Sequence, residues 1–201
     1  MWSINGLTQL DLSRNRLDMV HNFEPSWQLP TALSRSSFVL TLKSLCMGEN
    51  CLTDIPMSLC SLTVRLRSHP VKRLTALDLS SNQISSLPVT FARLVNLTHL
   101  DLRKNRLRSF PPVLLQLCSA SHVLLASNKL QLLVSEKILL HCQDLSDNRL
   151  QTLGDEVGLR FLTALTSLNL SNNSMAEIPL ELGLCTRITG ELLTGAQICR
   201  L

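Results

Sequence analysis

Hydrophobic and polar positions along the chain follow one repeated string, in which leucines and an asparagine keep fixed spacings. The clearest copy covers residues 74–88 and fits LxxLxLxxNxLxxLP, with Ile84 in one of the leucine positions. A second copy starts 23 residues later, at Leu97, and places its asparagine at Asn105. Over all copies, the asparagine recurs at Asn15, Asn50, Asn82, Asn105, Asn128, Asn148 and Asn173.

The string predicts one short strand in every repeat. Alternate side chains of a strand point to opposite faces, so the leucines of the LxL segment face a core and the residue between them faces solvent. A single repeat cannot bury its own leucines, but parallel stacking of repeats about 4.8 Å apart does so. The asparagine is expected to turn inward and to satisfy backbone groups of the adjacent turn. Residues 89–94 and 113–117 are expected as short helices or irregular segments on the other side of the sheet.

The spacing of the asparagines points to a known kind of repeat. Successive asparagines are 35, 32, 23, 23, 20 and 25 residues apart, and repeats of about 20–29 residues with this string resemble leucine-rich repeats. Residues 97–105 (LTHLDLRKN) and 165–174 (LTSLNLSNNS), with 178–185 and 192–195, are similar to intracellular leucine-rich repeat proteins. They look closest to the C-terminal part of the leucine-rich repeat-containing protein 40 family, which has Asp-Gly-Asn-Pro where residues 194–197 read Thr-Gly-Ala-Gln.

This resemblance implies a fold and a class of function. The fold is an α/β leucine-rich repeat solenoid, with a curved parallel sheet on the concave side and short helices or irregular segments on the convex side. The function is that of a binding scaffold, with no cofactor and no reaction.

We expect a single domain over residues 1–201, with seven clear repeats and one degenerate C-terminal repeat. Insertions are expected near 21–40 and 64–73, where consecutive asparagines are too far apart, and the second insertion carries four basic residues. In a later repeat Gln143 takes the position of an inward leucine. The N-terminus lacks the basic and apolar regions of a secretory signal. No apolar run approaches the roughly 20 residues that span a bilayer.

Composition narrows the possible partners. Leucine supplies 46 of the 201 residues and aromatics only 3%, so the core must be almost wholly aliphatic. The net charge of +4 is mild, and with no Tyr to stack bases the sequence argues against nucleic-acid binding. Seven cysteines occur without a CxxC pair, which gives no zinc-knuckle or thioredoxin-like signature. Reduced thiols in the cytoplasm are the expectation, and the nucleus stays open.

The residues between the two strand leucines form one solvent-facing column. In chain order it contains Asp11, Cys46, Asp78, Asp101, Leu124, Asp144 and Asn169. Paired carboxylates catalyse proton transfer only where burial raises the pKa of one of them, and this column is expected to be open to solvent. A role in binding and a plain solvated face therefore both stay open. A basic column follows the asparagines, at Arg16, Arg106, Lys129 and Arg149, and it either orients a charged partner or keeps the edge soluble.

A third column holds His99, His122 and Cys142 in three successive repeats. Two His and one Cys are suitable zinc ligands, and a Cys–His pair can act as nucleophile and base. Repeats align side chains in columns automatically, however, and the sequence shows no oxyanion hole or bounded pocket. A polar contact surface is therefore the favoured interpretation, with no metal site and no catalytic residues expected.

The sequence thus predicts a noncatalytic protein–protein interaction scaffold rather than an enzyme. The alternative is a regulatory fragment of a larger signalling protein, such as a regulator of a small GTPase or of a phosphatase. The partner is expected to be a protein, with neither nucleic acid nor membrane involved. The expected footprint lies in the central repeats and contains His99, Asp101, Arg103, His122, Leu124 and Asp144.

Overall fold

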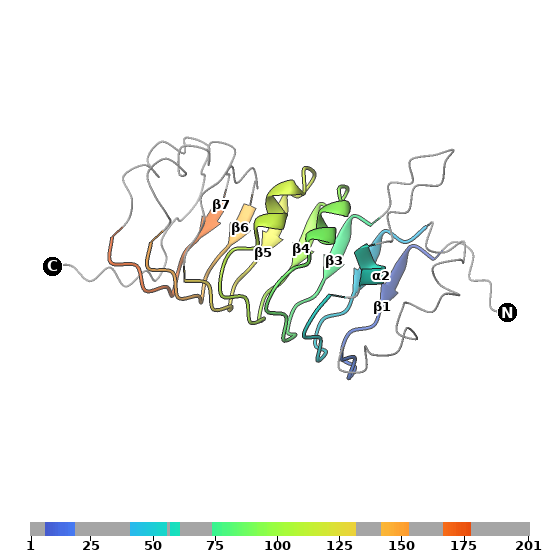
Figure 1. Ribbon diagram of the computed structural model, residues 1–201, viewed down its shortest axis with the longest axis horizontal. Helices are drawn as coiled ribbons and strands as arrows, with labels where there is room; N and C mark the ends of the chain where they lie inside the picture. Colours follow the sequence, from blue (N-terminus) through green and yellow to red (C-terminus); the bar gives the residue numbers. More distant parts are fainter. Residues whose placement is uncertain are drawn as a thin grey trace.

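The computed structural model describes residues 7–18, 41–55, 57–60, 74–131, 142–152 and 167–177. Within these ranges seven strands of three residues form one parallel sheet, in which every strand pairs with its neighbour in the sequence (Figure 1). The strands are β1 (Gln9–Asp11), β2 (Ser44–Cys46), β3 (Ala76–Asp78), β4 (His99–Asp101), β5 (His122–Leu124), β6 (Cys142–Asp144) and β7 (Ser167–Asn169).

The register of the sheet aligns the repeats residue by residue. Leu77 pairs with Leu100, and Leu100 pairs with Val123, so the middle residue of each strand stacks on the middle residue of the next. The side chains of Leu77, Leu100 and Leu102 are 2%, 1% and 0% exposed. The predicted inward leucines are therefore confirmed. The strands begin one residue before the first leucine of LxL and end before the second.

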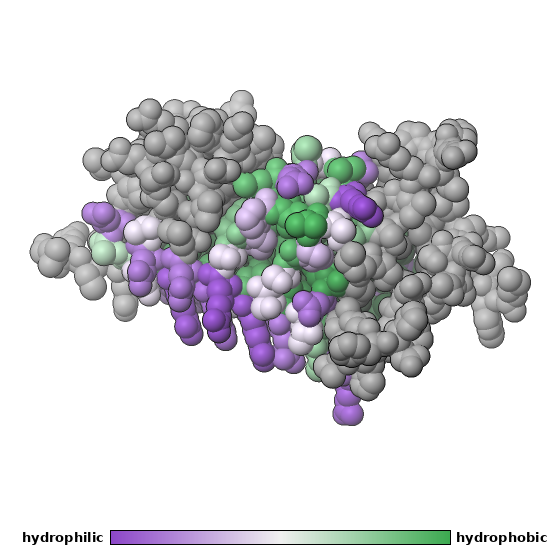
Figure 2. All heavy atoms as spheres, in the orientation of Figure 1, coloured by the Kyte–Doolittle hydropathy of each residue, from purple (hydrophilic) through white to green (hydrophobic). Residues whose placement is uncertain are grey.

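Short helices lie on the side of the sheet opposite its solvent-facing residues. They are α2 (Met57–Cys60), η3 (Val89–Arg93) and η4 (Pro112–Gln116), and the last two confirm the predicted short segments to within one residue. Pro88 and Pro111 precede η3 and η4 in extended conformation, because the proline ring fixes φ near the value found there. Hydrophobic residues gather over the short helices, and hydrophilic ones along the edge where the turns after the strands lie (Figure 2).

The core is a layer between the sheet and the helices. It is almost wholly aliphatic, as expected, and Phe91 and Phe110 are its aromatic members among the described residues, at 0% and 1% exposed. Phe91 lies in η3, between β3 and β4, and Phe110 lies just before η4, between β4 and β5. Complete burial of side chains of this size stabilises the stacked repeats by about 1.5–3 kcal/mol each.

The asparagines form a ladder of hydrogen bonds between repeats. The Nδ2 group of Asn105 donates to the carbonyls of Leu79 (2.9 Å), Leu102 (3.1 Å) and Arg103 (3.2 Å). Its Oδ1 accepts the N–H of Ile84, from the preceding repeat, at 3.0 Å. The side chain is 6% exposed, and the N–H of Ile84 would be buried without a partner if Asn105 were absent. The three carbonyls also accept from Asn82, Asn128 and the N–H of Ser81, so neighbouring repeats share them. The predicted role of the asparagine is confirmed.

The residue before each asparagine has a positive φ, which the sequence analysis did not predict. The angles lie between 52° and 55° at Arg14, Glu49, Ser81, Lys104, Ser127, Asp147 and Asn172. This left-handed conformation turns the chain sharply at the end of each strand and aims the asparagine inward. Since none of these residues is glycine, each repeat carries a small backbone strain.

Some predictions concern parts of the chain that lie outside the described residues. These are the insertions near 21–40 and 64–73 and most of the degenerate C-terminal repeat. Gln143 does take the inward register position in β6, opposite Val123 and Leu168. No helix in the described ranges is long and apolar enough to cross a membrane.

Candidate protein-binding surface

The first and third residues of the strands form one face of the sheet, which we name the open face. Its first column follows the series Gln9, Ser44, Ala76, His99, His122, Cys142 and Ser167. Its second column is the series of seven residues, from Asp11 to Asn169, expected from the sequence. The register brings five of the six predicted footprint residues together on β4, β5 and β6, and Arg103 follows two residues after β4. Nothing in the structure tests whether they bind a partner, so the footprint stays a prediction.

The acidic column has a structural role that sequence reasoning missed. Asp78 Oδ1 accepts the N–H of Ser80 at 2.8 Å, and Asp101 Oδ1 accepts the N–H of Arg103 at 2.9 Å. The same bond to the residue two positions later recurs at Asp11, Asp144 and Asn169. Such Asx turns fix the backbone just after a strand. The sequence does indicate these turns, because an Asp or Asn stands at this position in most repeats.

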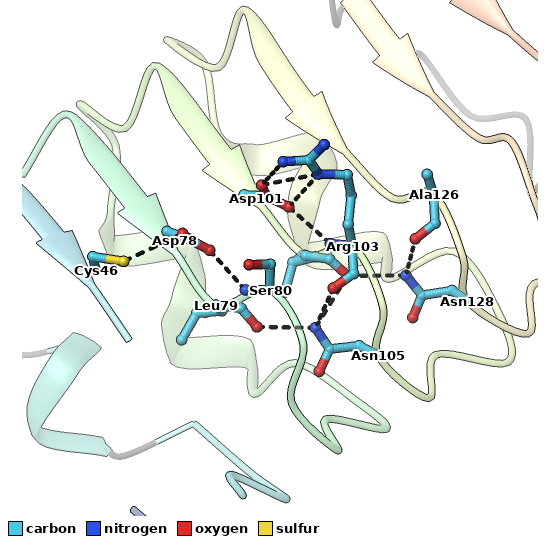
Figure 3. Close-up of polar contacts among 10 residues, drawn as sticks. Cys46, Asp78, Leu79, Ser80, Asp101, Arg103, Asn105, Ala126 and Asn128 are labelled. Carbon is cyan, nitrogen blue, oxygen red and sulfur yellow. Dashed lines mark hydrogen bonds and ion pairs between the residues drawn. The ribbon is translucent and has the colours of Figure 1, made fainter. Parts of the chain in front are cut away.

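The expectation that the acidic column is open to solvent is wrong at Asp101. Its side chain is only 16% exposed, because the guanidinium of Arg103 lies across it (Figure 3). Arg103 Nη2 lies 2.6 Å from Asp101 Oδ2, and Nε lies 3.1 and 3.0 Å from the two carboxylate oxygens. This hydrogen bonding raises the pKa of Arg103. The pair neutralises itself, so Asp101 presents less charge to a partner than the sequence suggests.

Asp78 is held differently. Its second oxygen, Oδ2, accepts a hydrogen bond from the Cys46 thiol on β2, at 3.3 Å (Figure 3). Burial raises the pKa of this thiol, which keeps it protonated and able to donate. A side chain in place of Gly48 would lie 3.0 Å from Ser80 Oγ and 3.2 Å from the Asp78 carboxylate. The glycine therefore makes room for Asp78 to lean over β2.

The two histidines of the other column form a stacked pair. The rings of His99 and His122 are 4.5 Å apart between centroids and 2° from parallel. Thr98 donates its only hydroxyl hydrogen to the carbonyl of Thr75 at 2.9 Å, so its 2.9 Å contact with His99 Nδ1 requires the ring N–H as donor. Ser121 contacts His122 Nδ1 in the same way, at 2.9 Å. Ser121 also donates its hydroxyl to the carbonyl of Thr98, at 3.3 Å. We therefore assign Nδ1–H to both rings, and in the neutral imidazoles this leaves both Nε2 atoms as hydrogen-bond acceptors.

The histidine column was also considered as a zinc site. The predicted alignment of His99 and His122 is confirmed by their stacking. The side chain of Cys142, the third residue of that set, lies outside the described residues. Among the residues that are described, no group of three or more His, Cys, Asp or Glu side chains is placed to hold a metal ion.

A groove of about 320 Å³ runs across the open face from β2 to β5. Its lining contains two carboxylates, Asp78 and Asp101, and two imidazoles, His99 and His122, together with Leu124. This volume lies at the lower end of the range for pockets that bind small groups. Leu124 is half-buried and gives the groove the apolar contact that the sequence predicted for it.

The basic column follows the edge next to the open face. Arg106 and Arg149 are exposed and Lys129 is half-buried. Their backbone N–H groups all bond to the preceding repeat, which stacks the three residues. The two ion pairs found within the described ranges involve other cations, Arg103 with Asp101 and Arg14 with Glu49. Neither pair includes Arg106, Lys129 or Arg149, so a binding role and a solubilising role of this column both stay predictions.

Comparisons with known proteins agree with the repeat geometry. A family model described as "Leucine rich repeat" matches residues 69–107, and a second one of the same description matches residues 164–185. Both segments contain a strand followed by an inward asparagine. The repeats are leucine-rich repeats. The sheet of parallel strands with short helices on one side is accordingly an α/β leucine-rich repeat solenoid.

A curated relative matches part of this chain. A probable serine/threonine-protein kinase, pats1 of Dictyostelium discoideum, is 34% identical over 92 residues. The match covers 46% of this chain but only 2% of the kinase. The chain thus corresponds to a small fraction of that relative.

Solved leucine-rich repeat structures superpose on most of the chain. The ectodomain of the receptor kinase GASSHO1/SCHENGEN3 from Arabidopsis thaliana, in complex with CASPARIAN STRIP INTEGRITY FACTOR 2, is 27% identical with a TM-score of 0.63. The plant peptide hormone receptor RGFR1, in complex with RGF2, is 28% identical with a TM-score of 0.62. These matches cover 92% and 90% of this chain, and 21% and 27% of the receptors. The repeats of FLRT2, in a complex with Latrophilin 3 and Unc5D, match at 19% identity and a TM-score of 0.69, which supports the fold.

Proposed function

We propose that this protein is a noncatalytic protein–protein interaction scaffold that binds its partner on the open face of the leucine-rich repeat sheet. The observation that carries the proposal is the groove across β2 to β5, which combines carboxylates, acceptor imidazoles and one outward leucine. Solenoids present such extended surfaces for binding. The two plant receptors similar to this chain were solved in complex with CASPARIAN STRIP INTEGRITY FACTOR 2 and RGF2, which supports a protein or peptide partner.

The proposed footprint is centred on His99, Asp101, Arg103, His122, Leu124 and Asp144. His99, Arg103 and His122 are exposed, and the other three residues are half-buried. Leu124 stands where most repeats have Asp or Asn, so its side chain makes no Asx turn and is free to contact a partner. A buried leucine within a polar rim is the usual arrangement at the centre of an interface.

Site-specific photo-crosslinking in cells tests this proposal. A photoreactive amino acid replaces His122 on the open face or, as the control, Val89 on η3, whose side chain is 85% exposed. The proposal requires one protein to be crosslinked from position 122 and not from position 89. That protein, purified, should then bind the parent chain and bind Leu124→Arg at least about tenfold more weakly, with Val89→Arg unchanged. Equal crosslinking from both positions would overturn the proposal.

The alternative function, a regulatory segment of a larger signalling protein, has support of its own. The match to the probable serine/threonine-protein kinase pats1 covers 2% of that protein, so a segment similar to part of this chain belongs to a much longer kinase. Under this alternative the open face binds in the same way, but the partner regulates, or is regulated by, a domain in the same polypeptide. Sequencing the full transcript distinguishes the two, because the alternative requires a further domain in the reading frame.

We further propose that the protein acts in the cytoplasm, as the intracellular leucine-rich repeat proteins that it resembles would. Among the described residues, Cys46, Cys51 and Cys118 are free thiols, which is the state that a reducing compartment maintains. Fluorescence microscopy of the tagged chain tests the location. A signal confined to the secretory pathway would contradict it.

A further inference from the structure

Small side chains line the part of the groove over β2 and β3. Three of the four solvent-facing residues there, Ser44, Cys46 and Ala76, are small, and the fourth is Asp78. Ala76 lies opposite His99 in the register, while His122 lies on the other side of His99. One face of the His99 ring is therefore covered by His122, and the other faces the space above the Ala76 methyl group.

The groups around this space accept hydrogen bonds and offer few donors. The Nε2 atoms of His99 and His122 are acceptors, because Nδ1 carries the hydrogen in both rings. Asp78 Oδ2 receives only the Cys46 thiol, which is a weak donor, at 3.3 Å. The corresponding carboxylate on β4 is bound by a guanidinium instead. Asp78 thus keeps acceptor capacity that a stronger donor can use.

The charge of the groove has one sign. Its lining includes the carboxylates of Asp78 and Asp101 and no Lys or Arg side chain. Arg103, next to it, is held on Asp101. A cationic group that enters beside Asp78 would therefore meet a carboxylate, an uncovered aromatic ring and free acceptors.

We propose that this part of the groove binds an arginine side chain of the protein partner. The guanidinium would stack on the uncovered face of His99 and donate to Asp78. Arginine fits better than lysine, because guanidinium is planar, has five donors and no acceptor, and stacks on rings, whereas ammonium is a compact point charge. The proposal rests on the proposed function, since it specifies which side chain of the partner occupies the open face.

Three synthetic peptides that differ at one position test the proposal. Their sequence is acetyl-Gly-Ser-X-Ser-Gly-amide, with X as arginine, lysine or the neutral isostere citrulline, and binding is followed by NMR titration of the full chain. The arginine peptide is expected to shift the ring signals of His99 and the amide signal of Ser80 at millimolar concentration. Citrulline is expected to bind about tenfold more weakly, because it removes the charge from the hydrogen bonds. No shift with arginine, or equal shifts with citrulline, would overturn the proposal.

Two variants and one matched control place the binding in the groove. Asp78→Asn removes the charge but keeps the Asx turn, since Asn169 makes the same turn with Ser171 at 3.1 Å. Ala76→Leu fills the space beside the His99 ring. Both should weaken the arginine peptide about tenfold, whereas the control Asp11→Asn, in the same column on β1 but outside the groove and the footprint, should not. If the control weakens binding as much as Asp78→Asn, the proposed position is wrong.

The result can be separated from that of the proposed function. If position 122 crosslinks one partner but Asp78→Asn binds that partner with parent affinity, the scaffold function holds and the arginine site is wrong. If the arginine peptide binds as expected while crosslinking shows no preference for the open face, the groove binds arginine but the proposed function fails.

Discussion

At the scale of single residues, the turn after each strand depends on two adjacent positions with opposite requirements. Asn105 must be an asparagine, because its amide bonds to three carbonyls and one N–H within a buried site. Lys104, just before it, has an exposed side chain and is constrained only through its φ of 54°. The first position therefore depends on hydrogen-bonding groups and the second on backbone conformation.

Asn105→Leu is expected to destabilise the protein although it adds apolar surface. The buried N–H of Ile84 loses its hydrogen-bond partner, and an orphaned buried group costs about 1–3 kcal/mol. The three carbonyls each lose one of their two donors. The free energy of unfolding should fall by about 1–3 kcal/mol in a urea titration. Asn15→Leu is the matched control, because Asn15 is exposed and water can satisfy the groups it leaves. A neutral Asn105→Leu would contradict the ladder role.

Substitutions of Lys104 test the backbone requirement alone. Lys104→Gly should leave the stability unchanged or raise it slightly, because glycine adopts a positive φ without strain. Lys104→Val should lower the free energy of unfolding by about 1–2 kcal/mol, because a β-branched residue is disfavoured there. Thermal melts of the two variants compare them directly. If valine is tolerated as well as glycine, the left-handed turn does not constrain this residue.

At the scale of the elements, each strand is too short to be stable without its neighbours. A strand of three residues has one inward side chain, and the residue that follows it supplies a second, as Leu100 and Leu102 do in the β4 repeat. These side chains pack against the equivalent leucines of adjacent repeats and against η3 and η4. The stability of an element therefore resides in contacts between repeats.

Leu100→Ala tests how much one inward side chain contributes. Leu100 is 1% exposed, and truncation of a buried leucine costs about 2–5 kcal/mol. The control Val89→Ala removes a side chain that is 85% exposed and should change the stability by less than about 0.5 kcal/mol. Both values come from denaturant unfolding. A loss below about 1 kcal/mol for Leu100→Ala would mean that the core closes around the missing atoms.

At the scale of the whole molecule, the described repeats form a row in which burial is lower at the β1 end than in the centre. The inward residue of β1, Leu10, is only half-buried, whereas Leu77 and Leu100 are almost completely buried. Such a row is stabilised by contacts between neighbouring repeats. Its end repeats therefore unfold locally at a lower free energy than its central repeats.

Hydrogen exchange of equivalent amides should follow this gradient. The N–H of Leu12 donates to the carbonyl of Cys46 at 2.8 Å, and that of Leu102 donates to the carbonyl of Leu124 at 2.9 Å. The bonds are alike, but Leu12 is half-buried and Leu102 is 0% exposed. Native-state exchange should therefore be about tenfold or more faster at Leu12. Equal rates would indicate that the described repeats open as one unit.

The repeat, the strands, the inward leucines and the asparagine ladder could all be predicted from the amino-acid sequence alone. These features could be predicted because they depend only on the repeat period. When copies of one string stack in parallel, equivalent residues lie in the same column. The columns of the open face, including the neighbours His99 and His122, follow from the same argument. The sequence likewise placed the apolar Leu124 among the polar residues of that face.

The hydrogen bonds and ion pairs that the side chains of those columns form became known only from the tertiary structure. Arg103 bonds to Asp101, whereas Asp78 bonds to the Cys46 thiol, although both carboxylates occupy the same column. The two sites differ because Asp101 is followed two residues later by an arginine, whereas Asp78 is followed by Ser80 and contacts the thiol on β2. Side-chain conformation depends on such individual neighbours, which the repeat period does not specify. The left-handed turns escaped prediction for a related reason, since the residues that adopt them share no side-chain type and are constrained only through their backbone.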